Sequence, residues 1–370
     1  TKMLSENSSE QAKIETIKNN ISKLNSELYL KQQELVKVSA NAEKLSGEKA
    51  MISERSKYNS EDVKLHDNII SLKEKILKLK KEKNAVILAH YYVPDDVQEV
   101  ADYIGDSFYL SKIAKNIGAD LIVFSGVSFM GESAKILNPK KKVLLPDRYA
   151  DCAMAHMASV AKVKKMREQI EDLAVVCYIN STAELKAVSD VCVTSSNAVE
   201  IVKKLSNKNI FFIPDGNLGA YVASKVPEKN IICNDGYCPI HRKISVNLVI
   251  ETKRAHPNAL FLVHPECSEE VTNLADFVGS TSEIIKFATN SEAKEFIIGT
   301  ENGVMYELKQ KNPDKLFLPA IPRQYCDDMK KVTLTKVKDS LVNERYVVEV
   351  DEELSIKAMK PLEKMLELAK

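Results

Sequence analysis

Three regularly spaced cysteines are the residues of this sequence best suited to binding a metal. Cys152, Cys238 and Cys326 are separated by 86 and 88 residues. Structural zinc sites usually have four ligands, often in C-x-x-C pairs, and this sequence has no such pair. A cubane iron–sulfur cluster held by only three cysteines would keep one open iron, which can act as a Lewis acid. The spacing therefore favours a cluster, with a zinc site or metal-free thiols as alternatives.

Polar side chains that could transfer protons repeat at nearly the same interval. They stand in pairs two residues apart, each directly after an apolar run: His90 and Tyr92, Tyr178 and Asn180, His264 and Glu266. Residues two apart on a strand point to the same side. Ser107, Ser195 and Thr281 keep the same offsets of 88 and 86 residues and precede helix-like stretches. We expect these three at helix N-caps, where the helix N-termini favour a carboxylate or phosphate.

Three landmarks with one period indicate a threefold internal repeat. Repeats of this length are whole α/β subdomains rather than solenoid units. Equivalent residues of three subdomains around a pseudo-threefold axis would meet at that axis. The sequence therefore predicts that the three cysteines and the polar pairs converge on one site.

Short apolar runs alternate with helix-length amphipathic segments from Ala85 onward, which is typical of an α/β fold with parallel sheets. The expected buried strands are 86–89, 121–124, 143–145, 174–177, 210–213, 260–263 and 296–298. We predict three homologous α/β subdomains around a pseudo-threefold axis. Their approximate limits are 85–173, 174–259 and 260–345, followed by a C-terminal helix, within a body of residues 66–370.

Residues 1–65 have a different texture and predict a helical arm. Nine of the ten positions 14, 17, 21, 24, 28, 31, 35, 38, 42 and 45 are apolar, and Lys31 is the exception. This spacing is that of a coiled-coil seam. The pattern fades around Gly47, and a second helix is expected to run to Asn84. We expect either a helical hairpin or a handle for self-association.

Composition excludes several classes of protein. The formal net charge is +1, which favours neither nucleic acid nor an anionic membrane. No long apolar run predicts a transmembrane helix or a signal segment, so we expect a cytoplasmic protein. Seven cysteines in a long chain do not suit a disulfide scaffold. The cysteines outside the repeat are expected to pack in the core: Cys177, Cys192, Cys233 and Cys267.

The repeated motifs resemble those of quinolinate synthases, in order, over residues 66–370. The first block carries ILAHYY (87–92), GVSFMGESAKIL (126–137) and Cys152; the second carries YINSTAE (178–184) and GYCPIH (236–241); the third carries HPEC (264–267) and GSTS (279–282). One difference is that Cys326 is followed by Asp327, where the family usually has proline. The arm is also not part of the family pattern.

The resemblance implies an enzyme of NAD biosynthesis that condenses iminosuccinate with dihydroxyacetone phosphate to quinolinate, phosphate and water. It implies a [4Fe–4S] cluster on Cys152, Cys238 and Cys326, and catalytic roles for Tyr92, His264 and Glu266. The implied substrate contacts are His90, Ser107, Tyr178, Asn180, Ser195, His264, Glu266 and Thr281. It also suggests a functional link to an aspartate oxidase or dehydrogenase that produces iminosuccinate.

Two other functions remain as alternatives. One is an iron–sulfur hydro-lyase that dehydrates a single hydroxy acid. The other is a triplicated metabolite-binding protein with a structural metal and no turnover.

Overall fold

The computed structural model describes the backbone of residues 2–370, and their side chains except at 2–12, 14, 19, 29 and 48–63. The chain divides into two compact units, one up to Asn68 and one from Ile69 to Lys370. Each unit is described by itself below.

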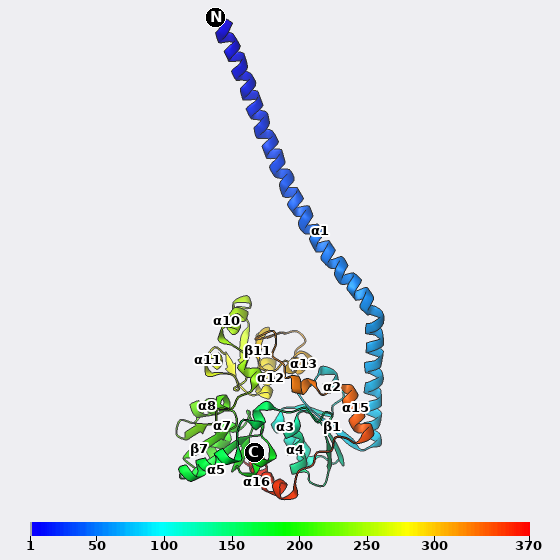
Figure 1. Cartoon of the computed structure of the whole chain (residues 1–370), viewed down its shortest axis with the longest axis vertical. Coiled ribbons are helices and arrows are strands. Elements are labelled where there is room, and N and C mark those ends of the chain that lie inside the picture. Colours follow the sequence, from blue (N-terminus) through cyan, green and yellow to red (C-terminus); the bar gives the residue numbers. More distant parts are fainter. Residues whose placement is uncertain (1) are drawn as a thin grey trace. The chain divides into compact units, whose positions relative to one another are not determined.

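The first unit is a single helical arm. Helix α1 (Lys2–Glu82) runs without interruption through Gly47 and continues into the second unit (Figure 1). The predicted break and hairpin are therefore wrong, because a hairpin needs a turn and the helix has no interruption at which the chain could fold back. One glycine costs a helix only about 1 kcal/mol, too little to end it here. The described seam residues are exposed, among them Ile21, Leu24 and Leu35. Coiled-coil pairing stays a prediction.

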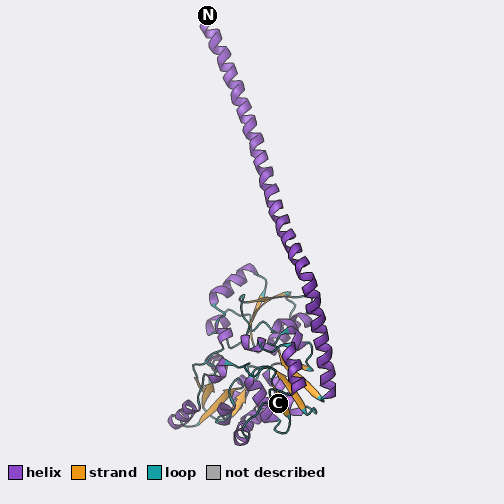
Figure 2. Ribbon diagram, turned by 45° about the vertical axis from the view of Figure 1, so that its right-hand side comes forward, coloured by secondary structure: helices purple, strands orange, loops and turns teal. Residues whose placement is uncertain are grey.

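The second unit contains three parallel four-stranded sheets, one in each repeat block, which confirms the predicted fold class (Figure 2). In every block the first strand of the block lies between the second and the third strands. The first sheet has β1 (Ala85–His90), β2 (Tyr103–Gly105), β3 (Leu121–Ser125) and β4 (Lys142–Leu144). The second has β5 (Leu173–Tyr178), β6 (Val191–Val193), β7 (Asn209–Ile213) and β8 (Asn230–Cys233). The third has β9 (Leu260–Val263), β10 (Phe277–Val278), β11 (Glu295–Gly299) and β12 (Leu316–Pro319).

Helices connect the parallel strands, as crossover connections require. Those of the first block are α2 (Asp95–Gln98), α3 (Ser107–Asn116), α4 (Ser128–Leu137), the 3₁₀ turn η1 (Ala153–His156) and α5 (Val160–Gln169). The second block has α6 (Ala183–Ala187), α7 (Ala198–Lys204), α8 (Gly216–Lys225), α9 (Pro239–Arg242) and α10 (Val246–Ala255). The third has α11 (Glu269–Thr272), α12 (Thr281–Asn290), α13 (Val304–Lys311), α14 (Asp327–Lys330) and α15 (Leu334–Asn343). The C-terminal helix α16 (Glu352–Leu368) follows.

An aspartate contact recurs in each block and shows that the repeat is structural. Asp102 Oδ2 accepts a hydrogen bond from the backbone N–H of Ile87, which lies 15 residues earlier, at 2.8 Å. The equivalent bonds run from Val175 to Asp190 at 2.6 Å and from Phe261 to Asp276 at 2.7 Å. A basic side chain pairs with each aspartate: Lys80, Arg167 and Lys253 respectively. The same local chemistry therefore joins the first two strands in all three sheets.

The predicted strands are all present, and the sequence missed mainly the short edge strands. The central strands β1, β3 and β5 are buried almost throughout, so they read as continuous apolar runs. Edge strands such as β2 and β10 span three and two residues, too few to show a periodicity. None of the helices in the described part of the chain is both long and apolar enough to cross a membrane.

Candidate active site

One cavity in the second unit collects every site residue that the sequence predicted. Its lining contains the three cysteines, the three polar pairs and the three hydroxyl residues: Cys152, Cys238, Cys326, His90, Tyr92, Tyr178, Asn180, His264, Glu266, Ser107, Ser195 and Thr281. The polar pairs come from the carboxyl ends of β1, β5 and β9, where parallel sheets present ligand sites. All three blocks therefore contribute equivalent positions to one site.

Each cysteine of the repeat has the same local structure. Cys152, Cys238 and Cys326 are extended and stand directly before the one-turn helices η1, α9 and α14. All three are partly buried. Burial, together with the neighbouring charges of Glu266 and Cys326, raises the pKa of Cys152 to about 12. Burial, Glu266 and Cys152 likewise raise the pKa of Cys238. Metal binding here must therefore displace protons from clustered thiols.

The two histidines of the repeat are held in one tautomer. His90 Nδ1 accepts the backbone N–H of Tyr92 at 3.2 Å, and His264 Nδ1 accepts that of Glu266 at 3.3 Å. The ring hydrogen of each neutral imidazole is thus on Nε2, which in His264 lies 3.1 Å from Ser195 Oγ. Burial lowers the pKa of both His90 and His264 to about 3, against the opposing charge of Glu266. Both rings are neutral donors at neutral pH.

Glu266 is a buried carboxylate at the centre of the site. Tyr178 Oη donates to its Oε1 at 2.5 Å, and His241 Nδ1 lies 2.8 Å from its Oε2. Burial alone would raise the pKa of Glu266, but His241, His264 and the hydrogen bonds lower it below its ordinary value. Glu266 is therefore ionised at neutral pH, although it is only 4% exposed.

Tyr92 connects to Glu266 through Thr300 and His241, of which the sequence did not single out Thr300. The hydroxyl of Tyr92 lies 2.7 Å from Thr281 Oγ1 and 2.8 Å from Thr300 Oγ1. Thr300 Oγ1 is in turn 3.0 Å from His241 Nε2, so the chain of contacts continues to Glu266. Burial and the charge of Glu266 raise the pKa of Tyr92 well above its usual value, which keeps its hydroxyl protonated.

A second connection ties the segment of Cys326 to that of Tyr92. Glu301 Oε1 accepts the backbone N–H of Cys326 at 3.0 Å and lies 3.1 Å from Lys330 Nζ. Lys330 also donates to the carbonyl of Tyr92 at 2.6 Å. Thr300 and Glu301 directly follow the strand end of β11. The signal that could have found Glu301 is that it lies one period, 86 residues, after the buried Asp215.

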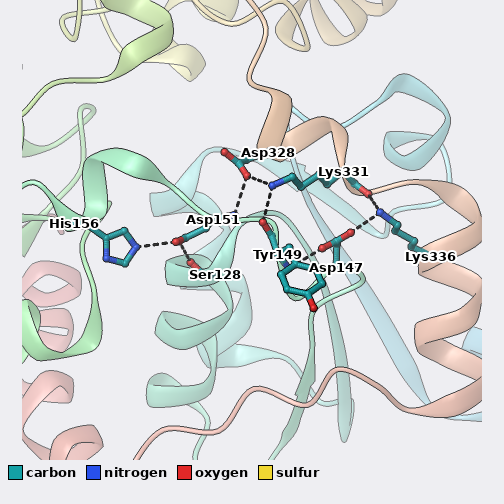
Figure 3. Close-up of polar contacts among 8 residues, drawn as sticks. All are labelled: Ser128, Asp147, Tyr149, Asp151, His156, Asp328, Lys331 and Lys336. Atoms are coloured by element: carbon teal, nitrogen blue, oxygen red, sulfur yellow. Dashed lines mark hydrogen bonds and ion pairs between the residues drawn. The ribbon is translucent and has the colours of Figure 1, made fainter.

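A polar network at the rim joins the segments of Cys152 and Cys326 (Figure 3). The Asp151 carboxylate contacts Ser128 and, at 2.8 Å, His156 Nε2. Lys331 bridges Asp328 at 2.6 Å and the carbonyl of Tyr149 at 2.9 Å. The backbone N–H of Asp151 points to Asp328 Oδ1 at 3.4 Å. These bonds hold two of the three cysteine segments together.

Asp147 completes this rim and stabilises the turn before Cys152. Lys336 pairs with its Oδ2, and the backbone N–H of Tyr149 donates to its Oδ1 at 2.7 Å (Figure 3). Burial would raise the pKa of Asp147, but these two bonds lower it below the ordinary value.

The structure corrects three expectations about individual residues. Ser107 and Thr281 are the first helical residues, and the N-caps are Asp106 and Ser280, whose side chains accept the N–H groups of Tyr109 and Glu283. Ser195 lies before α7, whose N-cap is Asn197, and it contacts His264 instead.

The expectation that Cys233 packs in the core is also wrong. Cys233 is exposed, because it ends the edge strand β8, whereas Cys177, Cys192 and Cys267 are buried as expected.

Comparisons with known proteins agree on one family. A family model described as quinolinate synthetase A protein matches residues 74–367. The quinolinate synthases of Fusobacterium nucleatum subsp. nucleatum and Caldicellulosiruptor saccharolyticus are each 54% identical over 291 residues, 79% of this chain and 97% and 96% of theirs. That of Clostridioides difficile is 52% identical over 291 residues, 79% of this chain and 96% of its own.

The comparisons make the chain an enzyme, and its three α/β subdomains contribute equivalent positions to one cavity, the candidate active site. The extent and identity of the match place it further: the chain belongs to the quinolinate synthetase A protein family.

Proposed function

We propose that this chain is a quinolinate synthase that condenses iminosuccinate with dihydroxyacetone phosphate to quinolinate, phosphate and water. The observation that carries the proposal is the convergence of twelve predicted residues from three repeat blocks on one cavity. A site for two small anions must hold several negative groups at once. The donors available here are neutral histidines, hydroxyls and an amide, together with the starts of α3 and α12.

Cys152, Cys238 and Cys326 are the residues that would hold a [4Fe–4S] cluster. Their fit rests on donor chemistry, because three thiols with the same local backbone structure line one cavity. The thiols also lie close enough to interact: the charge of Cys326 raises the pKa of Cys152, and the charge of Cys152 raises that of Cys238. When bound there, the cluster would supply an open iron that acts as a Lewis acid on substrate oxygen. With only three cysteines of the repeat available, one iron of such a cluster would have no protein ligand from this set.

The ionisation states of Tyr92 and Glu266 suit one to donate protons and the other to accept them. Tyr92 stays protonated and is suited to donate a proton to a leaving hydroxyl, while the Glu266 carboxylate is suited to remove one from carbon. The carboxylate is polarised by Tyr178 and His241, which fix its orientation. Thr300 links the two acid–base groups and acts as a positioning residue rather than a reacting one.

Substrate binding falls to the hydroxyl and amide groups. Ser107 and Thr281 open helices of ten residues, whose first N–H groups favour phosphate or carboxylate. Asn180 Oδ1 is buried and has no hydrogen-bond partner among the described residues, so a bound substrate would satisfy it. His90 Nε2–H is free to donate to a substrate anion because its Nδ1 is already engaged.

An anaerobic assay with both substrates tests this function. Quinolinate and phosphate should form only when iminosuccinate and dihydroxyacetone phosphate are both present and the cluster is intact. Dehydration of a single hydroxy acid, without a need for the second substrate, would favour a hydro-lyase instead. Binding without turnover of either compound would favour a metabolite-binding protein.

We further propose that the protein acts in the cytoplasm in NAD biosynthesis, receiving iminosuccinate from an aspartate oxidase or dehydrogenase. The instability expected of an imine in water makes close supply by such an enzyme advantageous. Mixing the two purified enzymes, each carrying its cofactor, with aspartate, dihydroxyacetone phosphate and the electron acceptor of the first enzyme would test the link, with quinolinate yield as the readout.

A further inference from the structure

One cysteine of the cavity has two other metal-binding side chains beside it. Cys238, His241 and Glu266 each offer one ligand atom, and these three atoms all lie within 4.8 Å of one another. Tetrahedral zinc holds sulfur at about 2.3 Å and nitrogen or oxygen at about 2.0–2.2 Å, so its ligand atoms are roughly 3.5 Å apart. Adjustments of about 1 Å in side-chain position would therefore be enough to close the three atoms around one ion.

The remaining atoms of the two ligand residues are already held in place. His241 presents Nδ1, because its Nε2 is 3.0 Å from Thr300 Oγ1. Glu266 presents Oε2, because its Oε1 accepts the hydroxyl of Tyr178 at 2.5 Å. Such outer contacts fix the ring orientation of a histidine ligand and the direction of a carboxylate ligand, and they strengthen metal binding.

One of the ligand atoms, Nδ1 of His241, also lacks a hydrogen-bond partner among the described residues. His241 is 2% exposed, and its Nδ1 makes no hydrogen bond of good geometry among the described residues, although Glu266 Oε2 is 2.8 Å away. Buried polar atoms normally have a partner, and a bound metal ion would be the partner of this nitrogen. Glu266 supplies the negative charge that a cation needs in a buried site.

We propose that Cys238, His241 and Glu266 bind a single divalent metal ion, zinc above all, when the chain carries no cluster. One sulfur, one nitrogen and one oxygen ligand suit Zn²⁺, and three protein ligands leave its fourth position open to water. The ion and the cluster exclude each other, because both need Cys238 Sγ. This last consequence rests on the proposed cluster, whereas the metal site itself does not.

Metal titration of the full-length chain tests the site without substrate or cluster. The protein is freed of iron anaerobically with a chelator and titrated with Co²⁺, whose visible absorption reports tetrahedral geometry and thiolate ligation. One equivalent should bind, and Zn²⁺ should displace it. Cys152→Ser should bind Co²⁺ within a factor of a few of the parent, whereas His241→Asn should bind at least about tenfold more weakly.

The opposite order of effects would overturn the proposal. If Cys152→Ser abolishes binding and His241→Asn leaves it unchanged, the ion sits on the three thiols. Equal binding by all variants would show an adventitious surface ion. Glu266→Gln repeats the test if His241→Asn does not fold, as judged by circular dichroism.

X-ray absorption on the zinc-loaded parent decides the ligand set without any substitution. One sulfur and two or three light ligands are expected, and three sulfurs would refute the site. Finally, the zinc-loaded parent should take up iron and sulfide far more slowly than the metal-free protein. If the zinc ligands are confirmed but iron and sulfide are taken up at an unchanged rate, only the placement of the cluster on Cys238 is contradicted. A failure of the zinc site can therefore be told apart from a failure of the proposed cluster site.

Discussion

Tyr178 Oη donates a 2.5 Å hydrogen bond to Oε1 of Glu266, so the second repeat block contacts the third at the centre of the site. The two residues are 88 positions apart in the sequence. Tyr178 is the last residue of β5, and Glu266 lies three residues after the end of β9. The contact therefore links equivalent edges of two sheets. The carboxylate of one block depends on a hydroxyl of another for its orientation, which bears on each prediction about the chemistry.

Replacing any cysteine of the repeat by serine should remove the cluster. Cys152→Ser, Cys238→Ser and Cys326→Ser should each lose bound iron, sulfide and activity together, because a serine hydroxyl is a poor substitute for a thiolate. Iron and sulfide analysis after anaerobic purification measures this. Cys233→Ser is the matched control and should keep its cluster, since Cys233 is exposed on β8. An intact cluster in Cys326→Ser would refute the threefold assignment.

The acid–base residues should affect turnover and leave the cluster in place. Tyr92→Phe and Glu266→Gln should lower kcat by about two to four orders of magnitude, the usual contribution of a general acid or base. Tyr109→Phe serves as a control on an exposed tyrosine of α3. Turnover within a few-fold of the parent would reduce Tyr92 and Glu266 to lining residues.

Thr300→Val should weaken catalysis through Tyr92 without touching substrate. The valine keeps the shape but removes the hydroxyl that lies between Tyr92 and His241. We expect kcat to fall roughly tenfold to a hundredfold with KM little changed, and Thr300→Ser to restore most of it. A rise in KM with unchanged kcat would instead place Thr300 in substrate binding.

The rim pair of Asp147 and Lys336 should stabilise the fold in a pH-dependent way. Lys336→Met should lower the free energy of unfolding by about 1 kcal/mol at neutral pH, since Asp147 is buried and Lys336 is partly exposed. The folded pKa of Asp147 is lowered, so its contribution is present above the unfolded value of about 3.9 and is lost as the pH falls through the folded value. The difference between parent and variant should therefore shrink in acid.

Thermal unfolding at several pH values, followed by circular dichroism, measures this difference. Lys294→Met is the control: Lys294 pairs with Asp314 on the open surface and should not change the midpoint. An equal loss at all pH values would show that Lys336 acts through packing and not through charge.

Deleting residues 1–60 should leave cluster content and specific activity nearly unchanged, because every site residue lies after residue 89. The exposed seam of α1 favours pairing with a second copy, since a single continuous helix cannot cover it. Light scattering should then show a smaller assembly for the truncated chain. Lys31→Leu, which fills the one polar seam position, should strengthen the assembly. A truncated protein that holds its cluster but does not turn over would place the arm at the active site.

The sequence by itself determined the repeat and the central strands, and it predicted the residues that line one cavity. These features are local or periodic: buried parallel strands read as apolar runs, and Cys152, Cys238 and Cys326 keep a constant interval that can be counted. The resemblance then added a role for each position, and all twelve positions do meet in one cavity.

Only the tertiary structure decided which side chains act on one another. The link from Tyr92 through Thr300 and His241 to Glu266 joins residues of three blocks, and its geometry depends on how the three sheets pack. Nothing near Thr300 in the sequence marks it, because a threonine after a strand end is common. The helix continues through Gly47 because the small free-energy cost of one glycine does not end a long helix. Cys233 is exposed because its strand lies at the edge of a sheet. Neither outcome could be read from the sequence.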